Sequence, residues 1–304
     1  SDVYKRQVDE QESAMDALLE DPYETSEPVN VLSSRKLSPQ FFSLVASTKW
    51  QERMEALDSL HAALKDSPRI QPDPGLDSYV QALQLRVQKD VNINVVLQAC
   101  RCLSGLAQGL RKDGTFLLSV LPTVLERLKE RKPATVEVLS ATLDALFLCG
   151  TLSDVLEPVA TAAAHKNPAV KAGTVRFLAR CLQSTTAAPN NADIKSMASL
   201  LLTSLGEGAG DVRDAAAHAM GTLLKLVGER PMAPFMEQLD DIKRSKVQEE
   251  AANVILAVRQ APTGKSAGMR PPSSAASASA VHGTPANSRA PARPQQNPTP
   301  AASR

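Results

Sequence analysis

A single tryptophan provides the strongest candidate for a binding residue in this chain of 304 residues. Trp50 is predicted to lie where a loop leads into a helix, and Lys49 and Arg53 flank it. Tryptophan and arginine are among the side chains that most often dominate the energetics of protein interfaces. An exposed Trp50 between two bases would therefore anchor a protein partner. The alternative is a tryptophan that packs only on its own helices.

Three bases recur at later helix starts, namely Lys132, Lys171 and Arg213. We expect them to occupy equivalent positions, so that their charges follow one edge of the molecule and attract an acidic partner. Any one of them alone would be an ordinary solvated charge. Asp214 would either orient Arg213 through a salt bridge or complement a helix N-terminus.

Residues suited to covalent or metal chemistry form no recognisable motif. The sequence has no phosphate-binding P-loop, no His-Glu-x-x-His and no Cys-x-x-Cys. The glycines of residues 206–210 lead into a predicted helix, but no strand precedes them, which favours a plain loop. Cys100 and Cys102 are two apart on a predicted helix and would face different sides. We therefore predict a protein that is not an enzyme and has no cofactor and no metal site.

Helices must position these residues. Apolar residues recur at helical spacing across the middle of the chain, and no segment shows the alternation of a strand. With 43% hydrophobic but only 3% aromatic residues, the core must consist mainly of Leu, Ala and Val, which is typical of packed helices. After a short first helix behind Pro39, the predicted helices span residues 51–65, 94–110, 116–130, 134–149, 153–164, 169–183, 194–205, 212–227, 233–241 and 243–258.

The helix-start segments recur with a regular period. With Trp50, Asn92, Lys132, Lys171 and Arg213 as markers, the intervals are 42, 40, 39 and 42 residues. A sixth such loop is predicted at residues 240–243. Two helices per repeat of about 40 residues indicate an all-α solenoid of HEAT type with about six helical hairpins. Stacking would place the loops within the repeats along one edge.

The charge distribution divides the chain into three zones. Residues 1–35 read as an acidic linker, residues 36–258 as the balanced helical domain, and residues 259–304 as a basic, Pro/Ser/Ala-rich disordered linker. The net charge of +1 excludes a uniformly basic nucleic-acid binder. No apolar run is long enough for a membrane span, and cysteines within apolar helical patterns suggest reduced thiols in the cytoplasm.

The two ends of the chain carry further expectations. The basic tail would bind an acidic polymer through the charges of Lys265, Arg270, Arg289 and Arg293. The alternative is a tail that serves only as a linker. The chain opens on Ser1, and residues 1–7 read as out of context, so we expect a fragment of a longer protein.

The helix-start segments resemble those of TOG (tumour overexpressed gene) domains. The resemblance is carried in order by Lys49-Trp50-Gln51-Glu52-Arg53, Lys89-Asp90-Val91-Asn92, Cys102-Leu103-x-Gly105-Leu106-Ala107, Lys132-Pro133, Lys166-Asn167-Pro168-x-Val170-Lys171 and Val212-Arg213-Asp214. Upstream, Asp21-Pro22-Tyr23-Glu24 and residues 27–33 resemble the linker before the second TOG domain of the XMAP215/Stu2/Alp14 microtubule polymerase family.

That resemblance implies a flat paddle that binds the curved αβ-tubulin heterodimer and promotes plus-end growth. Trp50 would contact β-tubulin, and Lys171 and Arg213 would pair with acids toward α-tubulin. The residues implied to bind tubulin are Lys49, Trp50, Arg53, Val91, Asn92, Lys132, Pro133, Asn167, Lys171 and Arg213. The basic tail would hold the microtubule lattice, at plus ends, spindle poles and kinetochores. Neither nucleic acid nor membrane is expected as a partner, and homodimerisation is expected only through sequence downstream of this chain.

Two other functions fit part of the pattern. A CLASP-type TOG protein would share tubulin binding but suppress catastrophe instead of accelerating growth. A HEAT scaffold for a partner other than tubulin, such as a transport receptor or a phosphatase regulatory subunit, would form a curved superhelix and grip its cargo with helices. In that scaffold the marked loops would be dispersed and not aligned on one edge.

Overall fold

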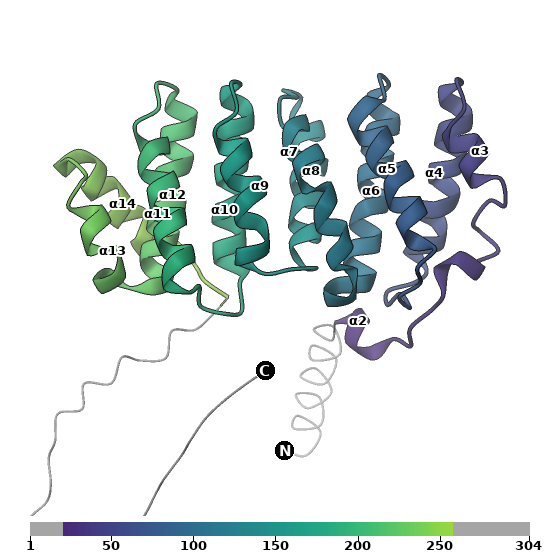
Figure 1. Ribbon diagram of the computed structural model, residues 1–304, viewed down its shortest axis with the longest axis horizontal. Coiled ribbons are helices and arrows are strands. Elements are labelled where there is room, and N and C mark those ends of the chain that lie inside the picture. The colour runs from purple at the N-terminus through teal and green to yellow at the C-terminus, as the bar shows by residue number, and fades with distance from the viewer. Residues whose placement is uncertain (1–20, 258–304) are drawn as a thin grey trace, which may run out of the picture. The chain divides into compact units, whose positions relative to one another are not determined.

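Six helical hairpins stand side by side in a computed structural model that describes residues 21–257 (Figure 1). The first helices of the hairpins are α3 (Phe41–Val45), α5 (Leu76–Lys89), α7 (Leu121–Arg127), α9 (Leu152–Ala163), α11 (Asn191–Leu205) and α13 (Glu229–Met236). The second helices are α4 (Trp50–Lys65), α6 (Ile93–Leu110), α8 (Pro133–Phe147), α10 (Pro168–Ser184), α12 (Gly210–Val227) and α14 (Asp241–Asn253). The prediction of an all-α HEAT-type paddle is confirmed.

Short local signals start the second helices. Asn92 and Asn167 are N-cap residues whose side chains accept hydrogen bonds from the backbone N–H groups of Asn94 and Ala169. Pro133 occupies the first turn of α8, where a missing N–H costs nothing. These caps fix where each loop ends and each second helix begins.

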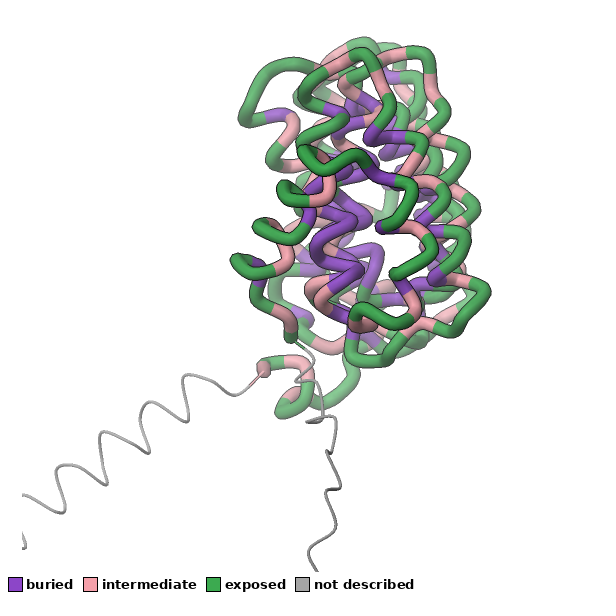
Figure 2. The backbone as a smooth tube through the Cα atoms, turned by 90° about the vertical axis from the view of Figure 1, so that its left-hand side faces the viewer, coloured by how far each residue is buried: buried purple, intermediate pink, exposed green. Residues whose placement is uncertain are grey.

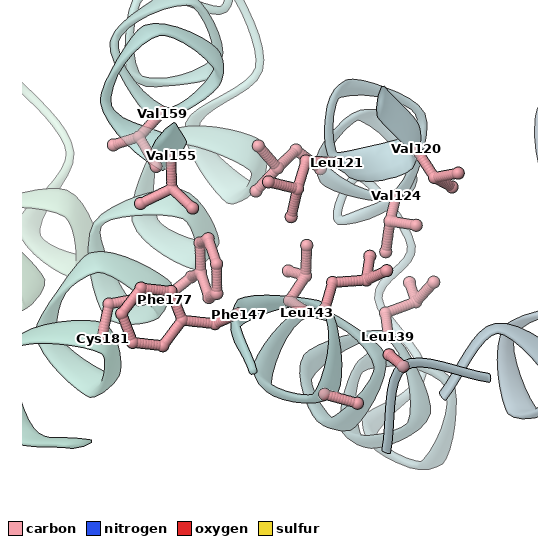
Figure 3. Close-up of a cluster of buried hydrophobic side chains, with 14 of the residues drawn as sticks. Val120, Leu121, Val124, Leu139, Leu143, Phe147, Val155, Val159, Phe177 and Cys181 are labelled. Atoms are coloured by element: carbon pink, nitrogen blue, oxygen red, sulfur yellow. The ribbon is translucent and has the colours of Figure 1, made fainter. Parts of the chain in front are cut away.

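The core lies between two layers of helices (Figure 2). The second helices pack against one another in the order α4, α6, α8, α10, α12, α14. In the centre of the row, Leu121, Leu143, Val155 and Phe177 meet between α7, α8, α9 and α10 (Figure 3). An aliphatic core of this kind gives each repeat little stability alone, so neighbouring repeats stabilise one another.

The four cysteines belong to this core. All four are free and buried, and burial raises the pKa of the Cys100 thiol to about 12. Burial also raises the pKa of Cys149 to about 12. A thiol that stays protonated in an apolar environment is a poor nucleophile and a poor metal ligand.

Several boundaries differ from the predicted ones. The helix α5 was missed, because the prolines of residues 67–77 obscured where it begins. The predicted helix over residues 116–130 is instead the 3-10 helix η2 (Arg111–Val120) followed by α7. Gly114 has non-helical backbone angles and marks a kink inside η2. The last helix ends at Asn253, five residues earlier than predicted.

Residues 21–35 make several contacts with the helices, while the expectation of a linker over residues 1–35 stays a prediction. The short helix α2 (Pro22–Thr25) places Tyr23 under the guanidinium of Arg111, whose carbon lies 4.1 Å from the ring centre. Arg111 also forms an ion pair with Asp21. After α2, Val31 in η1 (Val31–Ser33) is almost fully buried. The domain limits at residues 35 and 258 otherwise stay predictions.

Two findings concern the described residues alone. No helix within residues 21–257 is long and apolar enough to cross a membrane. The tail bases Lys265, Arg270, Arg289 and Arg293 lie outside the described residues, as does the rest of the predicted basic linker.

Candidate binding edge

The loops within the six repeats follow one edge of the paddle, at the top of Figure 1. We number these loops one to six along the chain and call their row the loop edge. The loops comprise residues 46–49, 90–92, 128–132, 164–167, 206–209 and 237–240. The alignment is the one predicted for a flat paddle, and it argues against a superhelix with dispersed loops.

Loops one and two expose two apolar side chains. Trp50 is the first residue of α4 and is 44% exposed, so it is not packed only on its own helices. Val91 in loop two is 96% exposed. Lys49 is exposed beside Trp50 and forms an ion pair with Glu52 at 2.8 Å, and this hydrogen bond raises the pKa of Lys49.

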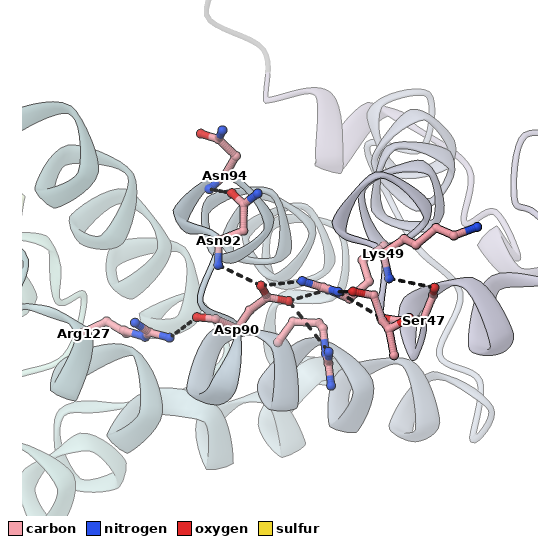
Figure 4. Close-up of polar contacts among 9 residues, drawn as sticks. Ser47, Lys49, Asp90, Asn92, Asn94 and Arg127 are labelled. Atoms are coloured by element: carbon pink, nitrogen blue, oxygen red, sulfur yellow. Dashed lines mark hydrogen bonds and ion pairs between the residues drawn. The ribbon is translucent and has the colours of Figure 1, made fainter.

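Arg53 lies mostly beneath the exposed surface, and its role as a partner-binding residue stays a prediction. It is only 7% exposed. Its Nε and Nη2 atoms donate to the two carboxylate oxygens of Asp90 at 2.7 and 2.9 Å, and its Nη1 atom donates to the backbone of loop one (Figure 4). Arg53 therefore holds loops one and two from beneath the edge, and four of its hydrogen bonds are made within the domain.

Loop two is held in place while Val91 projects from it. The Asn92 side chain caps α6, and the backbone N–H of Asn92 donates to Asp90 at 3.0 Å (Figure 4). Arg127 of α7 donates to the carbonyl of Asp90, also at 3.0 Å. The residues on both sides of Val91 are thus engaged, and Val91 itself is the part left for a partner.

Loop three presents bases at the middle of the edge. Lys132 is the N-cap residue of α8, Pro133 follows it, and both are exposed. Arg131 is exposed next to Lys132. By contrast, Arg127 and Lys129 form ion pairs with nearby glutamates at 3.6 and 3.4 Å.

Loops four and five are linked by their polar side chains. Asn167 caps α10, and Lys171 in the first turn of α10 forms an ion pair at 2.5 Å with Glu207 in loop five. Arg213 of α12 is exposed and donates to the backbone carbonyls of Glu207 and Gly208 at 2.9 and 2.6 Å. The glycine-rich loop therefore joins two helices and is braced by an arginine.

The predicted equivalence of Lys132, Lys171 and Arg213 is wrong. Lys132 is an N-cap residue, whereas Lys171 and Arg213 are the fourth residues of their helices. The loops differ in length, so aligning them by charge shifted the register. The fourth position holds Arg53, Lys171, Arg213 and Arg244. Each of the three arginines donates to at least one carbonyl of the loop before its own helix.

Asp214 has a partner that neither expectation named. It forms an ion pair with Lys246 of α14, and this hydrogen bond is the main reason why the pKa of Asp214 is lowered. The pair joins two second helices. Asp214 is therefore a contact between repeats and does not orient Arg213.

Sequence reasoning missed three exposed residues on or beside the loop edge. Arg131 and Lys166 are exposed bases in loops three and four, and Ile242, just after loop six, is 83% exposed. Their places in helix-start segments were the available signal. Within residues 21–257, no group of three or more His, Cys, Asp or Glu side chains is arranged to hold a metal ion.

The fold and the loop edge define a class of protein: a HEAT-type solenoid built as a paddle, with an aromatic residue and bases along one edge. No family model matches the chain. Among curated proteins, it is 35% identical over 250 residues to the spindle pole body component alp14 of Schizosaccharomyces pombe, a match covering 81% of this chain and 30% of alp14. It is 34% identical over 231 residues to the protein mini spindles of Drosophila melanogaster, covering 75% of this chain and 11% of that protein.

Two solved structures are similar to this chain in both sequence and fold. One, from work on microtubule plus-end tracking by XMAP215, CLIP-170 and EB1, has a TM-score of 0.73 and 32% identity, and the match covers 77% of this chain and 97% of that one. Another, from work on tubulin recruitment by microtubule polymerases with TOG domain arrays, has a TM-score of 0.70 and 29% identity, covering 80% of this chain and 51% of that one. This chain belongs to the XMAP215 family and contains a TOG domain. It spans about a third or less of the length of the curated relatives it matches.

Proposed function

We propose that the loop edge binds αβ-tubulin and that the domain serves a microtubule polymerase. The half-exposed Trp50 on the edge is the single observation that carries the proposal, because the chain exposes its only tryptophan where a partner can reach it. The similarity to a structure from work on tubulin recruitment supports the choice of partner.

The contacts would run along the edge in chain order. Trp50 and Val91 supply apolar surface toward β-tubulin. Lys132 supplies charge in the middle of the edge, and Lys171 and Arg213 meet acidic groups toward α-tubulin. Long basic side chains and an acidic partner favour fast encounter.

The mechanism needs no covalent step. Tubulin held by the loop edge and a basic tail held by the acidic lattice would raise the tubulin concentration near a growing end. A preference for curved tubulin would release the subunit once it straightens in the lattice. The domain therefore promotes growth as a binding module and not as an enzyme.

The place of the domain in the cell and in its parent protein is part of the same proposal. We assign it as the second TOG domain, because the residues before α3 resemble the linker that precedes that domain. The names of the relatives alp14 and mini spindles point to the spindle. Plus ends, spindle poles and kinetochores are the sites we propose. Neither nucleic acid nor membrane is a partner, and any homodimer would form through downstream sequence.

Gel filtration with purified tubulin tests the proposal. The wild-type chain is expected to elute with tubulin, and a variant combining Trp50→Ala with Arg213→Ala is expected to elute alone. Leu148→Ala is the matched control, because Leu148 is 44% exposed like Trp50 but follows the far end of α8. Coelution of the double variant at the wild-type level would show that the loop edge is not the binding surface.

A further inference from the structure

The imidazole ring of His165 shapes loop four. Its Nδ1 atom accepts a hydrogen bond from the backbone N–H group of Asn167 at 3.0 Å. The side chain of Asn167 in turn accepts from the N–H group of Ala169 at 2.9 Å, where α10 begins. In loop two, Asp90 makes the same bond to the residue two positions further on, Asn92, also at 3.0 Å. His165 therefore takes the place in loop four that Asp90 takes in loop two.

This hydrogen bond fixes which ring nitrogen of His165 carries the proton. A backbone N–H group can only donate, so Nδ1 must accept with its lone pair. A neutral imidazole with an unprotonated Nδ1 carries its hydrogen on Nε2. His165 is half-buried, and its Nε2 atom is not among the buried, unpartnered side-chain atoms of residues 21–257. The Nε2–H group is therefore a donor that solvent reaches.

The equivalent position in the other five loops holds side chains that are engaged within the domain. This position lies two residues before the N-cap residue of each second helix. Its other occupants are Ser47, Asp90, Glu130, Glu207 and Gln238. In the same order, their partners are Glu52, Arg53, Arg127, Lys171 and the carbonyl of Pro234. Among these six residues, only His165 has a donor nitrogen that is not engaged within residues 21–257.

We propose that His165 is a further tubulin-binding residue, which donates from Nε2–H to a carboxylate on tubulin. The exposed base Lys166 directly follows it, and Arg213 is exposed beside the next loop, so an acidic surface is the partner that this end of the loop edge attracts. The neutral imidazole adds a directed hydrogen bond among these charges, so its contribution depends on where one oxygen atom lies. This role rests on the proposed tubulin binding, whereas the tautomer does not.

The tautomer of His165 can be measured in the chain alone. Long-range proton–nitrogen NMR spectra distinguish a protonated ring nitrogen from an unprotonated one. At neutral pH we expect Nδ1 to be unprotonated and Nε2 to carry the hydrogen. The spectrum of His165→Asn identifies the signals by their loss. A hydrogen on Nδ1 of the neutral ring would overturn the proposal.

Two substitutions separate the two ring nitrogens in binding. His165→Asn keeps an acceptor for the N–H group of Asn167, as Asn92 does for Asn94 in loop two, but its side chain is too short to replace Nε2–H. It should unfold at the wild-type temperature and bind tubulin about tenfold more weakly, because a hydrogen bond to a charged group is lost. His165→Gln places an amide donor near the position of Nε2 and should retain more affinity than His165→Asn. Titration of fluorescently labelled tubulin measures both constants.

His218→Gln is the matched control. The ring nitrogens of His218 are both engaged, by Gln183 at 3.0 Å and by Glu250 at 2.7 Å, and the residue lies halfway along α12. This variant should bind tubulin as the wild type does, and a tenfold loss in it would overturn the proposal.

The order of the two His165 variants decides between a binding role and a purely structural one. Wild-type affinity in His165→Asn, with a loss in His165→Gln, would show that His165 only shapes loop four, and would overturn this proposal alone. A wild-type chain that does not bind tubulin would overturn the proposed function and this role with it.

Discussion

Loops one and two are joined by a buried ion pair, whereas loops four and five are joined by a pair that water reaches. Arg53 and Asp90 are almost fully enclosed, while the Lys171 and Glu207 side chains are 17% and 31% exposed. Both pairs connect neighbouring repeats at the same edge. They differ in how readily a partner can replace one member.

The difference suggests two kinds of binding surface on one domain. Loops one and two, at the first end of the edge, present apolar side chains from loops that a buried ion pair holds. Their contribution to binding should therefore depend on how well a partner's shape fits them. The other end offers bases whose present partners, Glu207 and the loop carbonyls, compete with any acid on the ligand. Pairs that water reaches contribute less to folding than enclosed pairs and exchange more easily.

The largest expected effect is on folding. Asp90→Asn should lower the free energy of unfolding by about 3–5 kcal/mol, because it leaves Arg53 buried without its anionic partner. Glu207→Gln should lower it by about 1 kcal/mol or less, because Lys171 can turn to water. Urea unfolding followed by circular dichroism measures both. Equal losses would remove the contrast between the two pairs.

The next effect is on tubulin affinity. Trp50→Ala should weaken binding by about 30-fold or more, as expected for an interface aromatic that a partner covers. Arg213→Ala should weaken it by about fivefold, because its charge acts from an exposed position. Titration of labelled tubulin, with Leu148→Ala as control, measures both constants. A larger loss for Arg213→Ala would place the binding energy at the other end of the edge.

The architecture was predictable because it depends on patterns among residues close together in the sequence. The ion pairs join residues that lie far apart in the sequence. Helical spacing and a regular period predicted the paddle, and the position of Trp50 at a helix start predicted that its side chain would be exposed. Arg53 looked equally exposed, but its partner Asp90 lies 37 residues further along the chain. Nothing near Arg53 in the sequence indicates that this arginine is enclosed.

Differences in loop length explain why the predicted equivalence of Lys132, Lys171 and Arg213 is wrong. We placed Lys132, Lys171 and Arg213 in one register because they share a charge. Lys132 is instead the N-cap residue before its helix, whereas the other two lie within the first turn of theirs. The acidic composition of residues 21–35 likewise gave no sign of the contacts that Val31 and Asp21 make with the helical domain. The amino-acid composition of a segment indicates whether it is polar, but it does not indicate which residues it contacts.

Tubulin binding through the two ends of the loop edge should depend differently on salt concentration. Raising NaCl from about 50 to about 300 mM shortens the screening length and weakens exposed charge pairs most. Lys132→Ala combined with Arg213→Ala should therefore bind tubulin with a flatter salt dependence than the wild type. Trp50→Ala should retain the wild-type slope at lower affinity. Identical slopes in all three proteins would show that the exposed bases do not contact acids on tubulin.

The smallest effect is an expected gain. Glu207→Gln removes the carboxylate that occupies Lys171, which then becomes available to an acid on tubulin. We expect tubulin binding to become about two- to threefold tighter at low salt, because the internal competitor is gone and no new charge is buried. Fluorescence titration at low salt measures this change.

Asp144→Asn is the control for that gain, since it frees a base of the same helix, Arg180, away from the loop edge. It should leave tubulin affinity unchanged. If Glu207→Gln binds more weakly than the wild type, Glu207 holds Lys171 and loop five in the binding geometry, and the second end of the edge is as preorganised as the first. That result would replace the contrast between a rigid and an adaptable end with two rigid ends that differ only in burial.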